Sequence, residues 1–355
     1  MAIKNTKLGG TDLVNGDNID ADNWNDTFDA TFSTTYHTVG YKKAGYPMCF
    51  SEDVWCMHQQ RTTDGGQTWA GDVALDNIRA VSRANEVNGI FCDQAGAGNE
   101  QYTTDAGANW NAAAVGMANV TNVYNIDFPT ASACVAGGTA GAGVPIWYTA
   151  DGGNNWAQAA VGPATACYAI SMFDANNGIA DCNNAGVRRL WHTVNGGANW
   201  TDTGQASRQG AVHCLNADRD YLDSNIEGGN WGVYKGTILG GTDADPKVYF
   251  ACISDYTQDY YAGERGFTVT GDGNTICISM VHFFNVEATN RYQYLTGMLT
   301  TKDEGDTWNI SASLPSVNKA SQGWSNPKNT YAIGSGNKIW TSWWDGAGAY
   351  YIFEV

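Results

Sequence analysis

The side chains that could do chemistry in this chain recur in a fixed pattern, T-x-[DN]-x-G-x-[TN]-W. Its third residue is Asp64, Asp105, Asp151, Asn195 and Asp303 in the five copies. Repeated carboxylates suggest general acid or base catalysis, which needs them positioned at a reacting group. The threonine hydroxyl and the Asp or Asn oxygen can instead bond backbone N–H groups within a turn. We interpret the acids as turn braces and predict no catalytic residue among them.

The glycine and the tryptophan shared by all five copies fit a hairpin between two strands. Glycine supplies a positive φ that other residues resist. Tryptophan offers a large apolar area, and we expect it to pack between neighbouring repeats. The predicted structural residues are Thr62, Asp64, Gly66, Trp69, Thr103, Asp105, Gly107, Trp110, Thr149, Asp151, Gly153, Trp156, Thr193, Asn195, Gly197, Trp200, Thr301, Asp303, Gly305 and Trp308.

Metal and cofactor signals are weak throughout the sequence. The five histidines stand singly, without the spacing of a transition-metal site. Neither a C-x-x-C pair nor a GxxxxGK[ST] phosphate loop occurs. We therefore expect no metal site and no cofactor.

The elements that must carry the motif are short strands. Between the third and fourth copies, Cys167–Phe173, Ile179–Cys182 and Val187–Thr193 are predicted strands, and Trp200 opens a fourth. Four short antiparallel strands in each repeat are typical of a propeller blade. Forty-three glycines and 15% charged residues also favour many strands joined by tight turns.

The spacing of the motif predicts the number of blades. Successive third residues are separated by 41, 46, 44 and 108 residues, so the last interval holds two blades. Lys235–Asp243 is interpreted as a decayed copy without its tryptophan, and one more blade follows Trp308. The predicted fold is all-β, a seven-bladed β-propeller over residues 35–355, with six blades as the alternative.

The motif resembles the Asp-box, or BNR repeat, of sialidase-like propellers, sortilin-type ectodomains and the photosystem II assembly factor family. Ile170–Ala180 is most similar to the repeat of the last family. A sialidase would need three arginines around a carboxylate, a tyrosine nucleophile with a glutamate, an aspartate acid and an R-I-P motif. No R-I-P occurs here, which disfavours that activity. A glycoside hydrolase and an intracellular assembly factor are the alternatives to a binding protein.

Residues 1–34 precede the repeats and form a separate segment. Asn15-Gly16-Asp17 reads as a turn, and Trp24 and Phe28 stand four apart on a short predicted helix capped by Asp20. The segment resembles the N-terminal attachment region of phage tail-fibre and other virion proteins, although Leu13 replaces the usual tryptophan. The alternative is a leader whose Trp24 and Phe28 cover a propeller edge.

The formal charge of −17 and the pI near 4.4 would repel phosphate backbones, so nucleic acid is not an expected partner. No run of eighteen apolar residues and no signal peptide is present, which predicts synthesis in the cytoplasm without membrane insertion.

The nine cysteines are expected to be thiols, with Cys49 and Cys56 the pair most suited to a disulfide. Cys49, Cys92, Cys134 and Cys182 precede the third motif residue by 15, 13, 17 and 13 residues, which we interpret as one repeated core position.

Two insertions are expected on the face opposite the motif, Ser254–Gly266 and Phe283–Tyr294. Tyrosine-rich loops with interspersed charges are typical of recognition surfaces, although these loops could also pack on each other or on another subunit. The predicted binding residues are Tyr256, Asp259, Tyr260, Tyr261, Arg265, Arg291, Tyr292 and Tyr294.

The sequence thus favours a non-enzymatic propeller on a virion surface, such as a tail-fibre, receptor-binding or decoration protein. Its expected partners are other virion proteins through residues 1–34 and a host-surface glycan or protein. Assembly into a homo-oligomer is left open.

Overall fold

The structure is a computed structural model. It describes residues 37–39, 48–51, 53–57, 60–65, 68–70, 78–81, 83–85, 87–92, 99–207, 211–227, 230–238, 243–250, 268–269, 275–286, 291–319, 327–332, 339–344 and 350–354. The regular elements in these ranges are all β-strands. The predicted attachment residues Trp24 and Phe28 lie outside the described residues.

The strands follow one another along the chain with short connections. The first half contains β1 (His37–Val39), β2 (Met48–Cys49), β3 (Trp55–Met57), β4 (Gln60–Thr62), β5 (Ile78–Val81), β6 (Gly89–Cys92), β7 (Gln101–Thr103), β8 (Asn111–Ala112), β9 (Val120–Asp127), β10 (Cys134–Ala140), β11 (Ile146–Thr149), β12 (Ala157–Gln158), β13 (Ala166–Met172) and β14 (Gly178–Asn184). The second half contains β15 (Val187–Thr193), β16 (Thr201–Ala206), β17 (Val212–Cys214), β18 (Asp220–Glu227), β19 (Asn230–Thr237), β20 (Asp243–Phe250), β21 (Thr268–Val269), β22 (Ile276–Val286), β23 (Arg291–Thr301), β24 (Asn309–Lys319), β25 (Pro327–Ala332), β26 (Ile339–Trp344) and β27 (Tyr350–Glu354).

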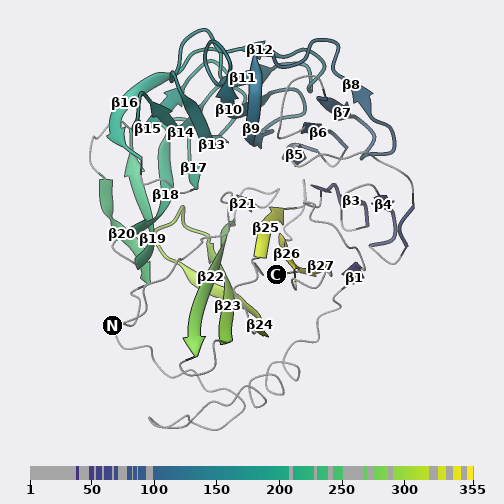
Figure 1. Cartoon of the computed structure of the whole chain (residues 1–355), viewed down its shortest axis with the longest axis vertical. Coiled ribbons are helices and arrows are strands. Elements are labelled where there is room, and N and C mark those ends of the chain that lie inside the picture. Colours follow the sequence, from purple (N-terminus) through teal and green to yellow (C-terminus); the bar gives the residue numbers. More distant parts are fainter. Residues whose placement is uncertain are drawn as a thin grey trace.

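Within the described residues the strands form seven antiparallel sheets, six of four strands and one of three. Five four-stranded sheets take their strands in chain order, as in β13-β14-β15-β16, and the three-stranded sheet is β2-β3-β4. The sheets surround a common axis (Figure 1), and first strands of neighbouring sheets touch, as β5 touches β9 and β9 touches β13. This radial array is a β-propeller, and each sheet is called a blade below, numbered from β2-β3-β4.

The last blade corrects one expectation. The sequence predicts that the first repeat begins at Thr35, but His37–Val39 pairs with Tyr350–Ile352 at the end of the chain. The order of this sheet is therefore β1-β27-β26-β25. β1 therefore supplies the fourth strand of the last sheet, and its pairing with β27 connects the two ends of the strand array.

The fourth blade follows its sequence prediction closely. β15 has the predicted bounds, and β13 and β14 differ from theirs by a few residues. The decayed copy is also in register. Thr237 pairs with Asp220 at the end of β19, as Thr193 pairs with Gly178 at the end of β15.

The predicted loop Phe283–Tyr294 is wrong as a loop. Its two ends lie in β22 and β23, where Phe283 pairs with Tyr294 and Val286 with Arg291. Phe283, Phe284 and Val286 at one end and Tyr292 and Tyr294 at the other are residue types enriched in strands, which favours a longer hairpin over an irregular insertion.

The interpretation of four cysteines as one repeated position is also wrong. Cys49 lies in the first strand of its sheet, while Cys92, Cys134 and Cys182 lie in second strands. Cys134 pairs with the motif residue Thr149, whereas Cys182 pairs with Arg189 near the other end of its sheet. The number of residues between each cysteine and its motif differs because the cysteines lie at different distances from the motif end of their sheets. All eight described cysteines, Cys56 included, are buried thiols.

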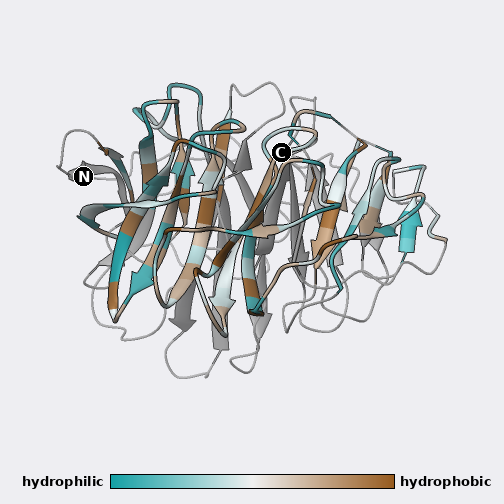
Figure 2. Cartoon of the chain, turned by 90° about the horizontal axis from the view of Figure 1, so that it is seen from above, coloured by the Kyte–Doolittle hydropathy of each residue, from teal (hydrophilic) through white to brown (hydrophobic). Residues whose placement is uncertain are grey.

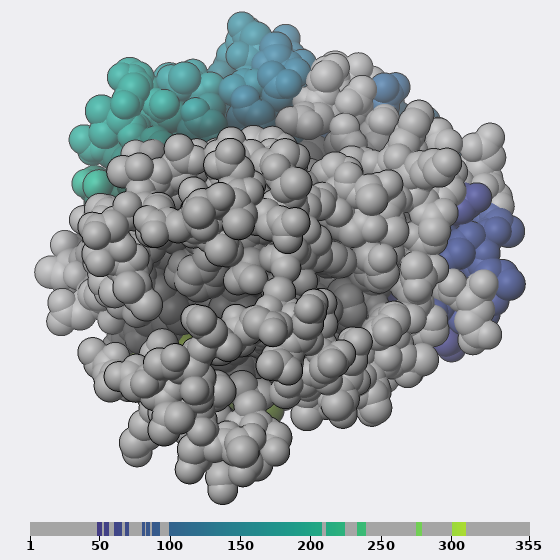
Figure 3. All heavy atoms as spheres, turned by 60° about the horizontal axis from the view of Figure 1, so that its bottom comes forward, coloured from purple at the N-terminus to yellow at the C-terminus, as the bar shows by residue number. Residues whose placement is uncertain are grey.

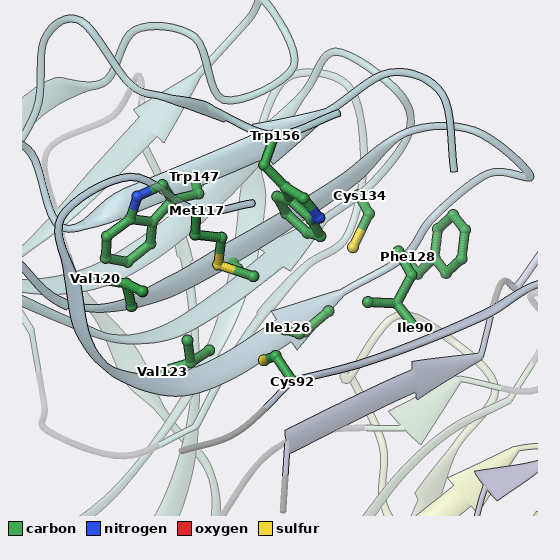
Figure 4. Close-up of a cluster of buried hydrophobic side chains, with 11 residues drawn as sticks. Ile90, Cys92, Met117, Val120, Val123, Ile126, Phe128, Cys134, Trp147 and Trp156 are labelled. Carbon is green, nitrogen blue, oxygen red and sulfur yellow. The ribbon is translucent and has the colours of Figure 1, made fainter. Parts of the chain in front are cut away.

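The core lies between blades. One buried cluster joins Ile90 and Cys92 of β6 with Cys134, Trp147 and Trp156 of the next blade (Figure 4). Hydrophobic segments run along the strands in the view from above (Figure 2). Burying apolar area between sheets supplies the main favourable term that holds adjacent blades together.

Candidate functional site

The motif turns form a repeated set of hydrogen bonds. The Thr103 hydroxyl donates to Asp105 Oδ1 at 2.8 Å and accepts from the backbone N–H of Gly107 at 3.0 Å. Asp105 Oδ1 also accepts from the backbone N–H of Asn109 at 2.8 Å. The bond between the threonine hydroxyl and the third residue is present in all five copies. These side chains are braces of the turn.

Hydrogen bonding also sets the ionisation of the motif acids. The slight burial of Asp105 would raise its pKa, but bonds from Asn109, Thr103 and Ala108 outweigh it and hold the pKa below its usual value. Bonds from Thr307 and Thr301 lower the pKa of Asp303 to about 2. A general acid needs a pKa raised toward neutrality, so these carboxyls are poorly suited to donate a proton.

Two constraints, backbone conformation and a close neighbour, favour glycine at the fifth position of the motif. Its φ is positive at Gly107, Gly153, Gly197 and Gly305, which confirms the prediction at the four described copies. It also abuts the second strand of the preceding blade. A Cβ on Gly153 would lie 3.0 Å from Ile90, and one on Gly197 would lie 3.1 Å from Val135. Gly66 lies outside the described residues.

Three motif tryptophans, Trp110, Trp156 and Trp200, pack between blades as predicted. Trp200 is 1% exposed and packs with Val135 and Ile146 of the preceding blade. Its indole N–H donates to the Gly197 carbonyl at 3.0 Å. Trp110 meets Phe91 edge-on, with ring centroids 4.8 Å apart, beside the first blade's Phe50. The motif is therefore a clamp between blades, and it occupies one face of the ring.

The inner strands of the third and fourth blades carry equivalent tyrosines away from this clamp. The β9–β10 pairing skips Tyr124, because Asn125 pairs with Gly137 and Val123 with Gly138. The β13–β14 pairing skips Tyr168 in the same way, because Cys167 pairs with Cys182 and Ala169 with Asp181. Each tyrosine is therefore the extra residue of a β-bulge, a device that redirects a side chain. Tyr168 lies in the half of its sheet nearer the 184–187 hairpin, because Met172 at the other end leads to the motif's Thr193.

The two tyrosines and an arginine form a stack across the blade boundary. The Tyr124 and Tyr168 rings are 5.6 Å apart between centroids and inclined by 12°. The Arg188 guanidinium lies 4.3 Å from the Tyr168 centroid. Arg188 is fixed by Asp181, whose Oδ1 accepts from Nε at 3.2 Å. Tyr168 nevertheless remains 37% exposed.

Asp181 is the buried anchor of the stack. Its side chain is 0% exposed and forms an ion pair with Arg188. Burial raises the pKa of Asp181, against the lowering effect of the Arg188 charge and of hydrogen bonds from Arg188 and Ser207. Because a buried charge is costly without a partner, Asp181 holds the guanidinium beside the Tyr168 ring.

The motif end of the inner strands is tied by polar side chains. Asp127 Oδ2 accepts from the Met172 backbone N–H at 2.6 Å, and Ser171 Oγ accepts from the Cys214 N–H at 3.0 Å. His213 Nδ1 lies 3.2 Å from Ser171 Oγ. Burial lowers the pKa of His213 to about 3, with Arg83 contributing. These bonds satisfy inner-strand edges that would otherwise be unpaired.

The predicted binding residues fall into two groups. Tyr256, Asp259, Tyr260, Tyr261 and Arg265 lie outside the described residues. Arg291, Tyr292 and Tyr294 begin β23, at the hairpin end farthest from the motif's Thr301.

The β22–β23 pairing covers eleven residues, against seven in β14–β15. Since a strand rises about 3.3 Å per residue, this hairpin is longer by about 13 Å.

Sequence reasoning missed Tyr124, Tyr168 and Arg188. A signal was present, because Tyr124 and Tyr168 each stand 27 residues ahead of the third motif residue, Asp151 or Asn195. The bulges that redirect them have no sequence marker here. Arg188 could not be assigned because its partner Asp181 lies on another strand.

Two features are absent from the described residues. No group of three or more His, Cys, Asp or Glu side chains could hold a metal ion. In the same residues no helix is long and apolar enough to cross a membrane.

The chain is a β-propeller with motif clamps between blades and a stack of two tyrosines on inner strands. No family model and no curated protein matches it. Among solved structures it is similar to YCF48 bound to D1 peptide, with a TM-score of 0.51 and 14% identity over 91% of this chain and 94% of that one.

Two further structures have the same fold. U3-55K is similar with a TM-score of 0.57 and 7% identity, over 91% of this chain and 96% of that one. The GH74 xyloglucanase of Xanthomonas campestris has a TM-score of 0.53 and 12% identity, and 53% of its length is covered by 90% of this chain. At these identities the likeness establishes the propeller fold alone.

Proposed function

We propose that the chain is a non-enzymatic recognition propeller that binds its ligand on the face opposite the motif. The observation that carries this proposal is the stack of Tyr124, Tyr168 and Arg188. Aromatic side chains fixed before binding give contact area at low entropic cost. Tyr168 and Arg188 lie in the half of their sheet that corresponds to the Val286–Arg291 end of the long β22–β23 hairpin.

The repeated carboxylates support a binding role over hydrolysis. A glycoside hydrolase needs two carboxyl groups about 5–10 Å apart, one with a raised pKa. The motif acids belong to separate blades and bond within their own turns. Asp181 has a raised pKa, but it is fully buried against Arg188.

The structural relatives fit this reading without deciding the ligand. YCF48 is a propeller of similar fold with a bound D1 peptide, and a xyloglucanase shares the fold as well. We propose that the motif is an Asp-box, with the bracing hydrogen bonds described above.

We further propose that residues 1–34 attach the propeller to a virion, on the resemblance of that segment alone. The host-surface ligand would then be bound by the opposite face. A deletion of residues 1–34 spares β1, which begins at His37. We expect the full chain to associate and the deletion variant to be monomeric in size-exclusion chromatography with light scattering. A monomeric full chain would contradict attachment through this segment.

A binding experiment tests the recognition proposal. Labelled protein would be applied to an oligosaccharide array and to a peptide array, with Tyr168→Ala compared with Phe173→Ala. Phe173 is the matched control, because it is 44% exposed and follows β13 at its motif end. We expect Tyr168→Ala alone to lose the signal.

Hydrolysis is tested separately. Xyloglucan is incubated with the purified chain and reducing ends are measured. We expect no release above a blank, and release would show an enzyme.

A further inference from the structure

We infer that the surface around Tyr124 and Tyr168 binds an uncharged oligosaccharide. This inference rests on the proposed function and names the class of ligand. It stands on three features of the described residues: the chemistry around the tyrosines, the charge balance of the stack and the bulges of the inner strands.

The polar side chains that precede Tyr124 on β9, and Thr139 opposite them, are neutral. The Thr121 and Thr139 hydroxyls lie 2.8 Å apart, and Asn122 Nδ2 donates to Thr139 Oγ1 at 3.2 Å. Thr121 and Asn122 precede Tyr124 on β9, and Thr139 lies opposite on β10. Hydroxyl and amide groups both donate and accept. They suit the hydroxyl groups of a sugar, while the exposed part of the Tyr168 side chain offers apolar area to its C–H groups.

The charges of the stack disfavour an ionic ligand. Arg188 is paired with the buried Asp181, so it offers no free positive charge to a carboxylate or phosphate. The net charge of −17 also opposes anionic ligands such as sialylated glycans. A cationic ligand would seek the face of an aromatic ring, but the Arg188 guanidinium already lies over the Tyr168 ring.

The bulges disfavour an extended peptide. Peptides that bind to sheet edges pair their backbone with a regular strand. The ladder shifts at Tyr124 in β9 and again at Tyr168 in β13. A bulge disrupts regular pairing and bends the strand. Recognition at this surface therefore depends on side chains, which is the mode available to a saccharide.

The surface lies on the part of the ring formed by residues 99–207. In the space-filling view this region gathers along one edge of the molecule (Figure 3). Two adjacent blades contribute to the surface, so an oligosaccharide would span their boundary.

The test uses an array of neutral and sialylated oligosaccharides beside a peptide array. Four proteins are compared: the full chain, Tyr168→Ala, Tyr168→Phe and Phe173→Ala. Tyr168→Phe keeps the ring against Arg188 and removes only the hydroxyl, so it stays informative if Tyr168→Ala does not fold. Circular dichroism and thermal melting report folding for each protein.

We expect the full chain to bind neutral oligosaccharides. Tyr168→Ala should weaken binding at least tenfold, Tyr168→Phe should weaken it severalfold, and Phe173→Ala should leave it unchanged. Binding only to sialylated glycans or peptides, lost in Tyr168→Ala, would overturn the inference and leave the proposed function standing. Full binding by folded Tyr168→Ala would overturn both, and absence of binding to either array would overturn the inference.

Discussion

The fourth and fifth blades have the same strand order but only one of them has the complete motif. In the fourth blade Thr193 ends β15 and is followed by Gly197 and Trp200. In the fifth blade Thr237 ends β19 in the same register, and no tryptophan follows it. The strand pairing therefore persists without the clamp.

In the fifth blade a buried tyrosine packs against the preceding blade. Tyr221 is 1% exposed and packs with Ile179 and Leu190 of the fourth blade. Its hydroxyl donates to Gln205 Oε1 at 2.8 Å, and Gln205 Nε2 donates to the Thr237 carbonyl at 3.0 Å. At both boundaries a large buried ring packs between the blades, although different strands supply it.

The largest expected effect comes from removing the ring of the complete clamp. Trp200→Ala should lower the free energy of unfolding by about 3–5 kcal/mol, because it empties a buried site between blades. Tyr221→Phe keeps its ring and loses only hydrogen bonding, which should cost about 1 kcal/mol. Urea unfolding measures both. If Trp200→Ala cost no more than Tyr221→Phe, the role of the ring as the clamp would be wrong.

The second prediction separates the two constraints on the motif glycine. Gly197 and Gly186 have φ values of 90° and 91°. Only Gly197 would bring a Cβ against Val135, since nothing lies within 4 Å at Gly186. Gly186→Ala should cost about 1 kcal/mol for its backbone, and Gly197→Ala about 1–3 kcal/mol more for overpacking. Equal midpoints in urea would refute the interblade contact.

The clamp and the fold were predictable because they repeat. Five copies of Thr, Gly and Trp at constant spacing identified a hairpin, and the spacing between copies identified the blades. The decayed copy at Thr237 followed from the same spacing. Because the pattern repeats, each copy supports the structural interpretation of the others.

The tyrosine stack could not be predicted from the sequence. The sequence named Tyr292 and Tyr294, which stay predictions, and it gave no marker for the bulges at Tyr124 and Tyr168. Bulges depend on how two strands pair, and the Arg188–Asp181 ion pair joins strands that only the folded sheet brings together. The closing strand His37–Val39 was missed because its partner is the far end of the chain.

A pH-dependent effect is expected from the histidine that joins the same two blades. His213 of the fifth blade meets Ser171 of the fourth, and its pKa is lowered to about 3 by burial and by Arg83. The unfolded chain, with a histidine pKa near 6.5, binds the proton first. Stability should fall as pH drops from about 6.5 toward 3, by up to about 1.4 kcal/mol per pH unit.

His213→Gln should lose this part of the pH dependence. Urea unfolding at pH 7, 6, 5 and 4 measures the slope for both proteins. Identical slopes would contradict the buried neutral histidine.

The smallest effect is expected at the motif acid itself. Asn195 already shows that an amide oxygen can accept the Thr193 and Asn199 bonds. Asp151→Asn should therefore cost less than about 1 kcal/mol at pH 7.

Acid sensitivity sharpens this prediction. The slight burial of Asp151 would raise its pKa, but bonds from Asn155, Thr149 and Asn154 outweigh it and lower the pKa. The stability that the ionised form contributes is present above the unfolded pKa near 3.8 and is lost as pH falls through the lower folded value. Melting of Asp151→Asn should lack this loss, and equal acid sensitivity would contradict the brace.

The most direct test of the account measures stability and binding together in two variants. Asp151→Ala and Tyr168→Ala are compared for melting temperature and for binding to the oligosaccharide array. We expect Asp151→Ala to have a lower melting temperature but to bind the oligosaccharide array as the full chain does, whereas folded Tyr168→Ala loses binding. Loss of binding in folded Asp151→Ala, with binding retained in Tyr168→Ala, would contradict the account by placing function on the motif face.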